Sequence, residues 1–392
     1  MNNHYHISFV TSTLNSGGSE RVISLLANAL QERGHLVEII NINRHKVFYP
    51  INAEVKLTFV EEECGGTFIG KKMMWLRSYI KKNRPDVVIP FMTDVECVTL
   101  ASMKGLRIPV ISSERYDPRA SNIQYKTIRW LFLRLTTHLV VQTEDIKSCY
   151  SKALQKRTSV IYNPVRNDIF PSSFLLNSVD FCHDSANLTQ ASSVLAASKV
   201  PPSSPRRIIS VGRLAPQKNF PMLINAFAAI KDEFPDWQLI ILGEGPERQS
   251  LQLTIDNLQL TDRVLMPGRS EHVIDELRKS KLFCMSTNAE GMSNALIEAM
   301  CVGLPVVSTD VCGAKELLQN PESGIIVPVG DVEALMQALR SLMSNEQLMK
   351  QMAERNLAKA EWFKQEKIVD QWEELIETVV SQSYKSRGKN KE

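Results

Sequence analysis

The chain has 392 residues, of which 43% are hydrophobic and 23% charged, the composition of an ordinary globular protein of about two domains. No run of roughly 18 or more apolar residues is present, and the first residues lack the basic-then-apolar pattern of a secretory signal, so we expect neither a membrane span nor export. The seven cysteines are scattered singly, which is typical of a reduced cytoplasmic protein and argues against a structural zinc site.

The charge is distributed unevenly along the chain. Residues 1–170 contain 23 Lys and Arg against 15 Asp and Glu, a net charge of +8, whereas the remaining residues contain 23 against 28, a net charge of −5. A basic first half fits contact with phospholipid headgroups, a phosphorylated substrate or nucleic acid, although a solvated basic surface has the same composition.

The first half alternates short β-branched runs, which favour strands, with stretches whose apolar residues recur at helical spacing. The expected strands lie at 5–12, 35–42, 55–60, 86–92, 108–113, 138–143 and 158–165. The expected helices between them lie at 19–34, 71–83, 94–104 and 120–136.

The same alternation starts again near residue 206. The expected strands are at 207–214, 237–243, 263–268, 281–287, 305–310 and 324–330, and two further helices run to about 343 and over 346–360. Such alternation predicts a parallel sheet covered by helices on both faces. We therefore expect an α/β fold with two doubly wound domains.

The domain boundaries follow from this alternation. We expect the domains at 1–170 and 206–362, and a linker or insertion rich in Ser, Asn, Ala and Pro at 171–205. An amphipathic run predicts a terminal helix at 363–382, and the polar residues 383–392 are predicted to be a disordered tail.

Ligands of doubly wound sheets bind beyond the carboxyl ends of the strands, so the strand-to-helix loops are the places to search for chemistry. After the first strand, Gly17 and Gly18 open a helix whose N–H groups can approach an anion. In the first loop of the second half, Arg213 and Lys218 provide two cations that suit a diphosphate. An ordinary helix-start turn and a solvated basic turn would explain the same two loops without a ligand.

The run "EGMSNALIEAMCVGLP" places a carboxylate on each side of a predicted helix start. Ser293 or Asn294 can cap this helix, and Gly303 with Pro305 would end it. The free N–H groups at its start can bind phosphate, and Glu298 one turn inside can accept from ribose hydroxyls. Glu290 would then face a reacting sugar. A core helix with two solvated glutamates would show the same pattern.

Taken together, "NSGGSERV", "GRLAPQKN", "ILGEGPE" and "EGMSNALIEAMCVGLPVVSTD" resemble the retaining glycosyltransferases of the GT-B fold, the family called group 1 or family 4. The resemblance implies two Rossmann-like domains facing across a cleft, with the acceptor bound by the first domain and a nucleotide sugar by the second. It implies that the terminal helix crosses back to the first domain. It also implies catalytic roles for Glu290, Arg213 and Lys218. The donor would be bound by Gly17, Gly18, Arg213, Lys218, Glu290, Gly291, Met292, Ser293, Asn294, Ala295 and Glu298.

One segment departs from the family pattern. Many relatives have a histidine after the strand that reads "VISSERYDP" here, where this chain has Ser113, Glu114 and Arg115. We place Glu114 and Arg115 on the acceptor or sugar side of the expected site.

The resemblance predicts transfer of a hexose or N-acetylhexosamine from a nucleotide sugar to a glycan or lipid-linked acceptor in surface polysaccharide biosynthesis, such as that of lipopolysaccharide. A UDP-sugar is the expected donor and GDP-mannose is the second candidate. We expect no cofactor and no nucleic-acid partner. No metal is expected, because no carboxylate cluster has metal spacing. A sugar-nucleotide epimerase or a non-catalytic scaffold would also be compatible with this fold.

Two basic and aromatic stretches, "KKMMWLRSYIKK" and "KTIRWLFLRL", suggest a peripheral contact with the anionic inner face of the cytoplasmic membrane. If they do not bind a membrane, Trp75 and Trp130 are expected to be core residues of layer helices.

Overall fold

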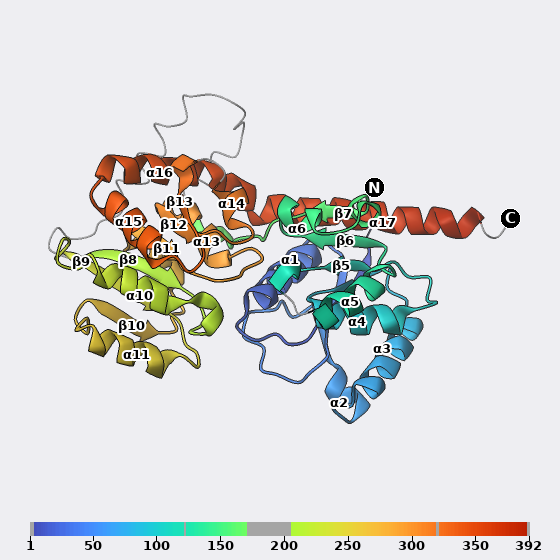
Figure 1. The fold of residues 1–392 in the computed structure, drawn as a ribbon. Coiled ribbons are helices and arrows are strands. Elements are labelled where there is room, and N and C mark those ends of the chain that lie inside the picture. The colour runs from blue at the N-terminus through green and yellow to red at the C-terminus, as the bar shows by residue number, and fades with distance from the viewer. Residues whose placement is uncertain (1–3, 121–122, 171–204, 319–320, 390–392) are drawn as a thin grey trace. The chain divides into compact units, whose positions relative to one another are not determined.

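The computed structural model describes residues 4–120, 123–170, 205–318 and 321–389, so the predicted linker at 171–205 lies almost wholly outside the described residues. The chain forms two compact units (Figure 1). Unit 1 comprises Met1–Pro164 and Gln365–Glu392, and unit 2 comprises Val165–Lys364.

Unit 1 contains a parallel sheet whose strands all fall on predicted β-branched runs. Its first four strands have the order β3-β2-β1-β4, and a second set has the order β5-β6-β7. Bridges between Val88 and Val110 and between Phe91 and Ser113 join β4 to β5, so the strand order reverses between β1 and β4. The strands are β1 His6–Thr11, β2 Leu36–Asn41, β3 Lys56–Phe59, β4 Val87–Pro90, β5 Ile111–Ser113, β6 His138–Val141 and β7 Thr158–Val160.

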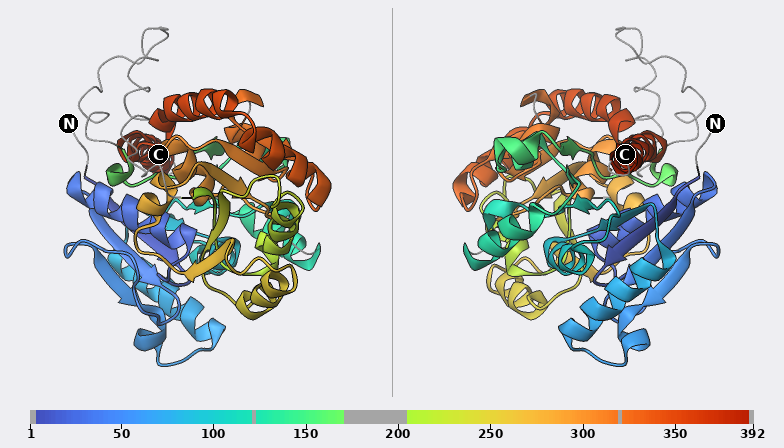
Figure 2. Two further views of the ribbon diagram at one scale, coloured as in Figure 1. Left: turned by 90° about the vertical axis from the view of Figure 1, so that its left-hand side faces the viewer. Right: turned by 90° about the vertical axis from the view of Figure 1, so that its right-hand side faces the viewer.

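Helices lie on both faces of this sheet (Figure 2). They are α1 Gly18–Glu32, α2 Val60–Cys64, α3 Ile69–Asn83, α4 Thr93–Met103, α5 Ile123–Leu133, α6 Glu144–Ser148 and α7 Lys152–Gln155. The four long helices confirm the predicted ones. The short helices α2, α6 and α7 were not predicted, because one turn is too short to show a 3.6-residue period.

Unit 2 contains a six-stranded parallel sheet of order β10-β9-β8-β11-β12-β13, which reverses between β8 and β11. Its strands are β8 Arg206–Val211, β9 Trp237–Leu242, β10 Val264–Gly268, β11 Leu282–Met285, β12 Val306–Thr309 and β13 Ile325–Val327. Its helices are α10 Phe220–Ala228, α11 Arg248–Asn257, α12 Val273–Arg278, α13 Asn294–Cys301, α14 Ala314–Leu317, α15 Val332–Met343 and α16 Glu346–Lys359. The two sheets confirm the predicted α/β class of two doubly wound domains.

The terminal helix α17, Gln365–Lys389, belongs to unit 1. Its buried residues pack in the unit 1 core, where Trp372 stacks on Phe91 with the ring centroids 6.1 Å apart. Arg33 next to α1 forms ion pairs with Asp370 and Glu373 at 2.6 Å each. Burial of an apolar face together with these contacts explains why the segment is helical and fixed to this unit.

The predicted boundaries differ from the structure at two places. The unit boundary falls at Pro164 instead of residue 170, because Val165 pairs with Lys364 and Arg278 donates to the carbonyl of Ile169 at 3.0 Å. The predicted disordered tail at 383–392 is wrong over 383–389, which continue α17. Tyr384 donates a hydrogen bond to Asp86, and no proline interrupts the helix before its end.

Candidate active site

Two loops of unit 2 meet at the carboxyl edge of its sheet. They follow the neighbouring strands β8 and β11, between which the strand order reverses, and this is where doubly wound sheets bind ligands. The carbonyl oxygen of Gln217 accepts from the Asn288 N–H and from the Thr287 hydroxyl, each at 2.8 Å. The Asn219 amide donates to the Asn288 side chain at 2.9 Å. These bonds fix the two loops against each other and therefore fix the side chains that they carry.

Lys218 and Glu290 form the central ion pair of these loops. The Lys218 Nζ lies 3.0 Å from each carboxylate oxygen of Glu290, and the two side chains are only 19% and 17% exposed. Gln217 donates to the carbonyl of Ala289 at 2.6 Å and, at 3.3 Å, to Glu290. Gly212 lies close beside this pair, since a Cβ there would be 3.1 Å from Cε of Lys218. The structure thus brings together two of the three predicted catalytic residues.

Arg213, the third predicted catalytic residue, lies in the same loop as Lys218. Its side chain is exposed and forms no hydrogen bond or ion pair within the described part of the chain. An arginine in this position can donate two parallel hydrogen bonds to an incoming phosphate.

Helix α13 begins beside Glu290. Of the two predicted caps the structure has Ser293, whose hydroxyl accepts from the Leu296 N–H at 3.3 Å. The helix ends at Cys301, and Gly303 after it has φ +77°, as expected for a glycine that ends a helix. Glu298 is 6% exposed, so it is not a solvated surface residue. Of the other predicted donor residues, Gly291 and Met292 are buried, and Asn294 and Ala295 are half-buried at the helix start.

The segment "GEGPE" supports the loop that carries Arg213. A Cβ on Gly243 would lie 1.8 Å from the carbonyl oxygen of Gly212, and one on Gly245 would lie 2.2 Å from that of Leu214. Leu214 exchanges backbone hydrogen bonds with this segment, donating to Glu244 and accepting from Glu247 at 3.0 Å each. Glycine is needed here because the two backbones are in contact.

Gly17 and Gly18 lie in unit 1, at the start of α1 after β1. In this structure a carboxylate of the chain itself lies close to Gly17: a Cβ there would be 2.2 Å from Oε2 of Glu20. Thr13 also donates to Glu20, at 3.2 Å. Burial raises the pKa of Glu20 above its ordinary value, against the opposing hydrogen bonds.

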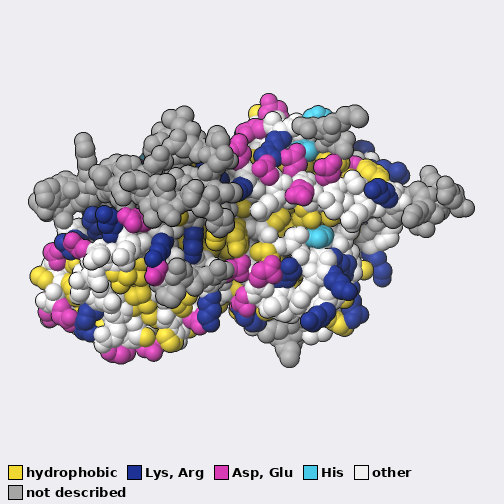
Figure 3. All heavy atoms as spheres, turned by 90° about the horizontal axis from the view of Figure 1, so that it is seen from above, with side chains coloured by type: hydrophobic (Ala, Val, Ile, Leu, Met, Phe, Trp, Pro, Cys, Tyr) yellow, Lys and Arg dark blue, Asp and Glu magenta, His cyan; other side chains and the backbone are white. Residues whose placement is uncertain are grey.

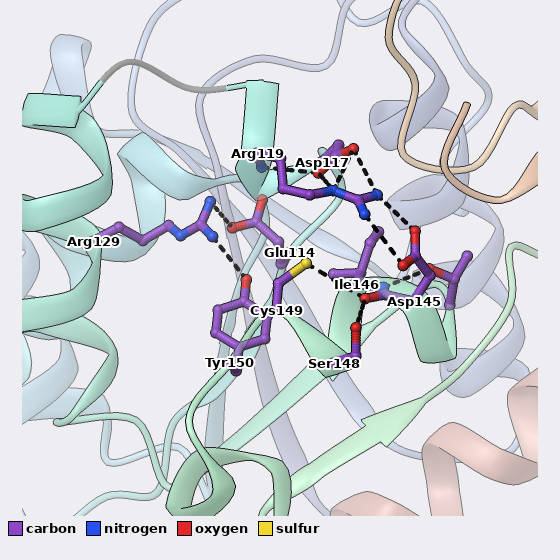
Figure 4. Close-up of polar contacts among 10 residues, drawn as sticks. Glu114, Asp117, Arg119, Arg129, Asp145, Ile146, Ser148, Cys149 and Tyr150 are labelled. Carbon is purple, nitrogen blue, oxygen red and sulfur yellow. Dashed lines mark hydrogen bonds and ion pairs between the residues drawn. The ribbon is translucent and has the colours of Figure 1, made fainter. Parts of the chain in front are cut away.

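Glu114, which we predict to lie on the acceptor or sugar side of the site, has a buried side chain within unit 1. It is 0% exposed, and its carboxylate accepts from the Thr93 hydroxyl at 3.0 Å. The carboxylate also pairs with Arg129 at 3.2 Å (Figure 4). Arg129, itself 5% exposed, also donates to the hydroxyl of Tyr150 at 3.1 Å. Glu114 therefore connects α4, β5 and α5 inside unit 1.

Arg115 is buried beside this group. It donates to Ser113 at 2.9 Å and to Asn163 at 2.7 Å, and its guanidinium lies over the ring of Phe91 at 4.7 Å. Burial lowers the pKa of Arg115 to about 9. Burial and the charge of Glu114 raise the pKa of the neighbouring Glu96 well above its ordinary range. Sequence patterns did not identify Glu96 or Arg129, because polar residues within helices are ordinarily solvated.

Metal ligands do not gather anywhere in the described ranges. No group of three or more His, Cys, Asp or Glu side chains there is arranged to hold a metal ion. Nor does any helix within those ranges have the length and apolar character needed to cross a bilayer.

Comparisons with known proteins agree with this architecture. Residues 194–359 match the family model "Glycosyl transferases group 1", and residues 16–168 match "Glycosyltransferase Family 4". An α-1,4-N-acetyl-D-galactosaminyltransferase of Campylobacter jejuni that acts on a GalNAc-containing diNAcBac-PP-undecaprenol is 28% identical, over 95% of this chain and 98% of its own. The amylovoran biosynthesis glycosyltransferase AmsD of Erwinia amylovora is 23% identical, over 92% and 96%.

Solved structures show the same fold. HepE of Anabaena in complex with UDP has a TM-score of 0.74 at 16% identity, covering 95% of this chain and all of its own. Sucrose-phosphate synthase of Thermosynechococcus elongatus has a TM-score of 0.79 at 16% identity, covering 96% and 99%.

The two doubly wound units have the GT-B fold that these solved glycosyltransferases share. The chain belongs to family 4 of these enzymes, the glycosyl transferases of group 1.

Proposed function

We propose that the chain transfers a hexose or N-acetylhexosamine, with retention of anomeric configuration, from a UDP-sugar to a glycan or lipid-linked acceptor in surface polysaccharide biosynthesis. The observation that carries this proposal is the pairing of Lys218 and Glu290 where β8 and β11 end, with Arg213 exposed in the same loop. The relative from C. jejuni acts on an undecaprenol-linked glycan, and HepE has been solved with UDP and with UDP-glucose, which supports this substrate class.

The proposed chemistry rests on charge. As the bond to the anomeric carbon breaks, negative charge grows on the leaving diphosphate. Lys218, Arg213 and the backbone N–H groups at the start of α13 can stabilise that charge as prearranged donors. Glu290 would face the sugar and Glu298 the ribose. Because cationic and N–H donors are already present for the diphosphate, the proposal requires no metal.

The donor is tested by a thermal-shift panel of UDP-glucose, UDP-galactose, their N-acetylhexosamine counterparts and GDP-mannose, each in the presence of EDTA. We expect a UDP-sugar to raise the melting temperature most, since a ligand at 100 times its dissociation constant stabilises a protein by about 2.7 kcal/mol. A larger shift with GDP-mannose would favour that donor instead. The absence of any shift would contradict nucleotide-sugar binding.

We also propose that unit 1 contacts an anionic membrane surface through α3, α5 and the residues beside them. Trp130 is 56% exposed, which contradicts the core interpretation of this residue, and Arg134 lies 3.6 Å from the centroid of its ring. Other large apolar side chains are exposed along the same helices and their flanks: Phe68, Ile69, Met74, Ile128, Leu131 and Leu135. Lys and Arg side chains cluster at one end of unit 1 (Figure 3). Exposed aromatic and basic residues together favour an interfacial contact.

Vesicle flotation tests this contact. We expect the protein to float with phosphatidylglycerol vesicles at low salt but not at high salt, and Trp130→Ser to weaken flotation. Trp362→Ser is the matched control, because Trp362 is 42% exposed and has Lys359 over its ring in unit 2. Equal flotation with phosphatidylcholine vesicles, or none at all, would refute the membrane contact.

A further inference from the structure

The ion pair between Lys218 and Glu290 places a negative group on a lysine that the proposed function assigns to the donor diphosphate. Both carboxylate oxygens lie 3.0 Å from Nζ, so this carboxylate approaches the ammonium as two phosphate oxygens would. Both side chains are mostly buried, and water therefore screens the pair less than it would at the surface.

Lys218 has little freedom to serve both groups at once. Its Cε lies 3.1 Å from the point that a Cβ on Gly212 would occupy, so the chain runs close along this glycine, and its loop is bonded to the Glu290 loop at Thr287 and Asn288. A diphosphate that bonds Nζ must therefore share or displace the Glu290 carboxylate. Arg213 is different, since its exposed guanidinium has no such partner in the described chain.

We propose that Glu290 is the resident counter-ion of Lys218 in the empty site, and that the donor diphosphate exchanges with it. This inference rests on the proposed function. The exchange releases the Glu290 carboxylate from the ammonium only when a diphosphate is bound. The carboxylate therefore becomes available to the sugar hydroxyls at that moment. The Gln217 amide, which donates to both Ala289 and Glu290, keeps the released carboxylate beside the site.

The exchange has a measurable consequence for binding. A ligand that competes with an internal partner binds only those molecules in which the partner has moved away. Its apparent affinity is therefore reduced by the fraction of such molecules. Removing the charge of Glu290 should therefore strengthen the binding of a diphosphate even though it weakens catalysis. A role for Glu290 in contacting sugar alone would leave diphosphate binding unchanged.

The experiment is calorimetric titration of inorganic pyrophosphate and of UDP into the full chain. We expect Glu290→Gln to bind both about three- to tenfold more tightly than the wild type, which is near and just above the upper end of the range for exposed ion pairs. Glu233→Gln is the matched control, since Glu233 lies before β9, at the amino edge of the same sheet, and is paired with Arg340 at 2.7 Å. It makes the same charge change and should bind as the wild type does.

Two further variants test the exchange if Glu290→Gln does not fold or binds more tightly for another reason. Glu290→Asp shortens the side chain by one methylene and should bind with intermediate affinity, which serves if Glu290→Gln does not fold. Combining Lys218→Met with Glu290→Gln should remove the gain. If Glu290→Gln and Glu290→Asp bind no more tightly than a wild type that does bind UDP, the exchange is refuted while donor binding stands. If neither the wild type nor any variant binds either probe, both the exchange and the proposed function fail.

Discussion

Replacing Lys218 by methionine is expected to lower the rate of sugar transfer by about 10²–10³, the loss measured when one prearranged donor to a developing negative charge is removed. Methionine keeps the length of the apolar chain that packs beside Gly212. The loss should therefore come from the missing ammonium. The assay is release of free nucleotide from the donor that gives the largest thermal shift.

Lys279→Met is the control for this variant. Lys279 comes before β11, at the amino edge of the same sheet, and forms an exposed ion pair with Glu276 at 2.8 Å. Exposed pairs contribute little, so this change should leave the rate within about twofold of the wild type. If Lys218→Met kept more than about a third of wild-type activity, Lys218 would have no important role in stabilising the leaving group.

Replacing Arg129 by methionine is expected to destabilise unit 1 by about 3–5 kcal/mol, the usual cost of breaking a buried ion pair from one side. The change leaves the fully buried carboxylate of Glu114 without its cation and removes a donor to Tyr150. Urea unfolding followed by tryptophan fluorescence measures the effect. Arg134→Met is the control, because Arg134 is exposed and directly follows α5, the helix that carries Arg129.

The double variant Arg129→Met with Glu114→Gln separates the pair from its surroundings. Replacing both charges should recover most of the lost stability, since a buried pair often contributes little beyond compensating its own desolvation. If the single variant unfolded at the wild-type urea concentration, Glu114 would not depend on Arg129. The expected loss concerns the fold of unit 1 and should precede any loss of donor binding by unit 2.

Much of the fold was predictable because regular elements repeat a local pattern. Strand runs such as that of β1 and apolar spacing such as that of α1 appear within a window of a few residues. The end of α17 was not, because residues 383–389 have no strong pattern, and the hydrogen bond from Tyr384 to Asp86 joins residues far apart in sequence. The position of the unit boundary was missed for the same reason, since the pairing of Val165 with Lys364 joins residues far apart in sequence.

The features of the candidate site likewise fall into those that local sequence predicts and those that only tertiary packing decides. By itself the sequence determined which residues stand in the loops after β8 and β11, among them Arg213, Lys218, Glu290 and the cap Ser293, because loop position and helix caps are local properties. Only the tertiary structure decided that Lys218 and Glu290 hold each other, while Glu114 and Arg115 are enclosed within unit 1. Pairing and burial depend on groups that are brought together by the packing of distant segments. The local spacing of residues does not encode which distant groups come into contact.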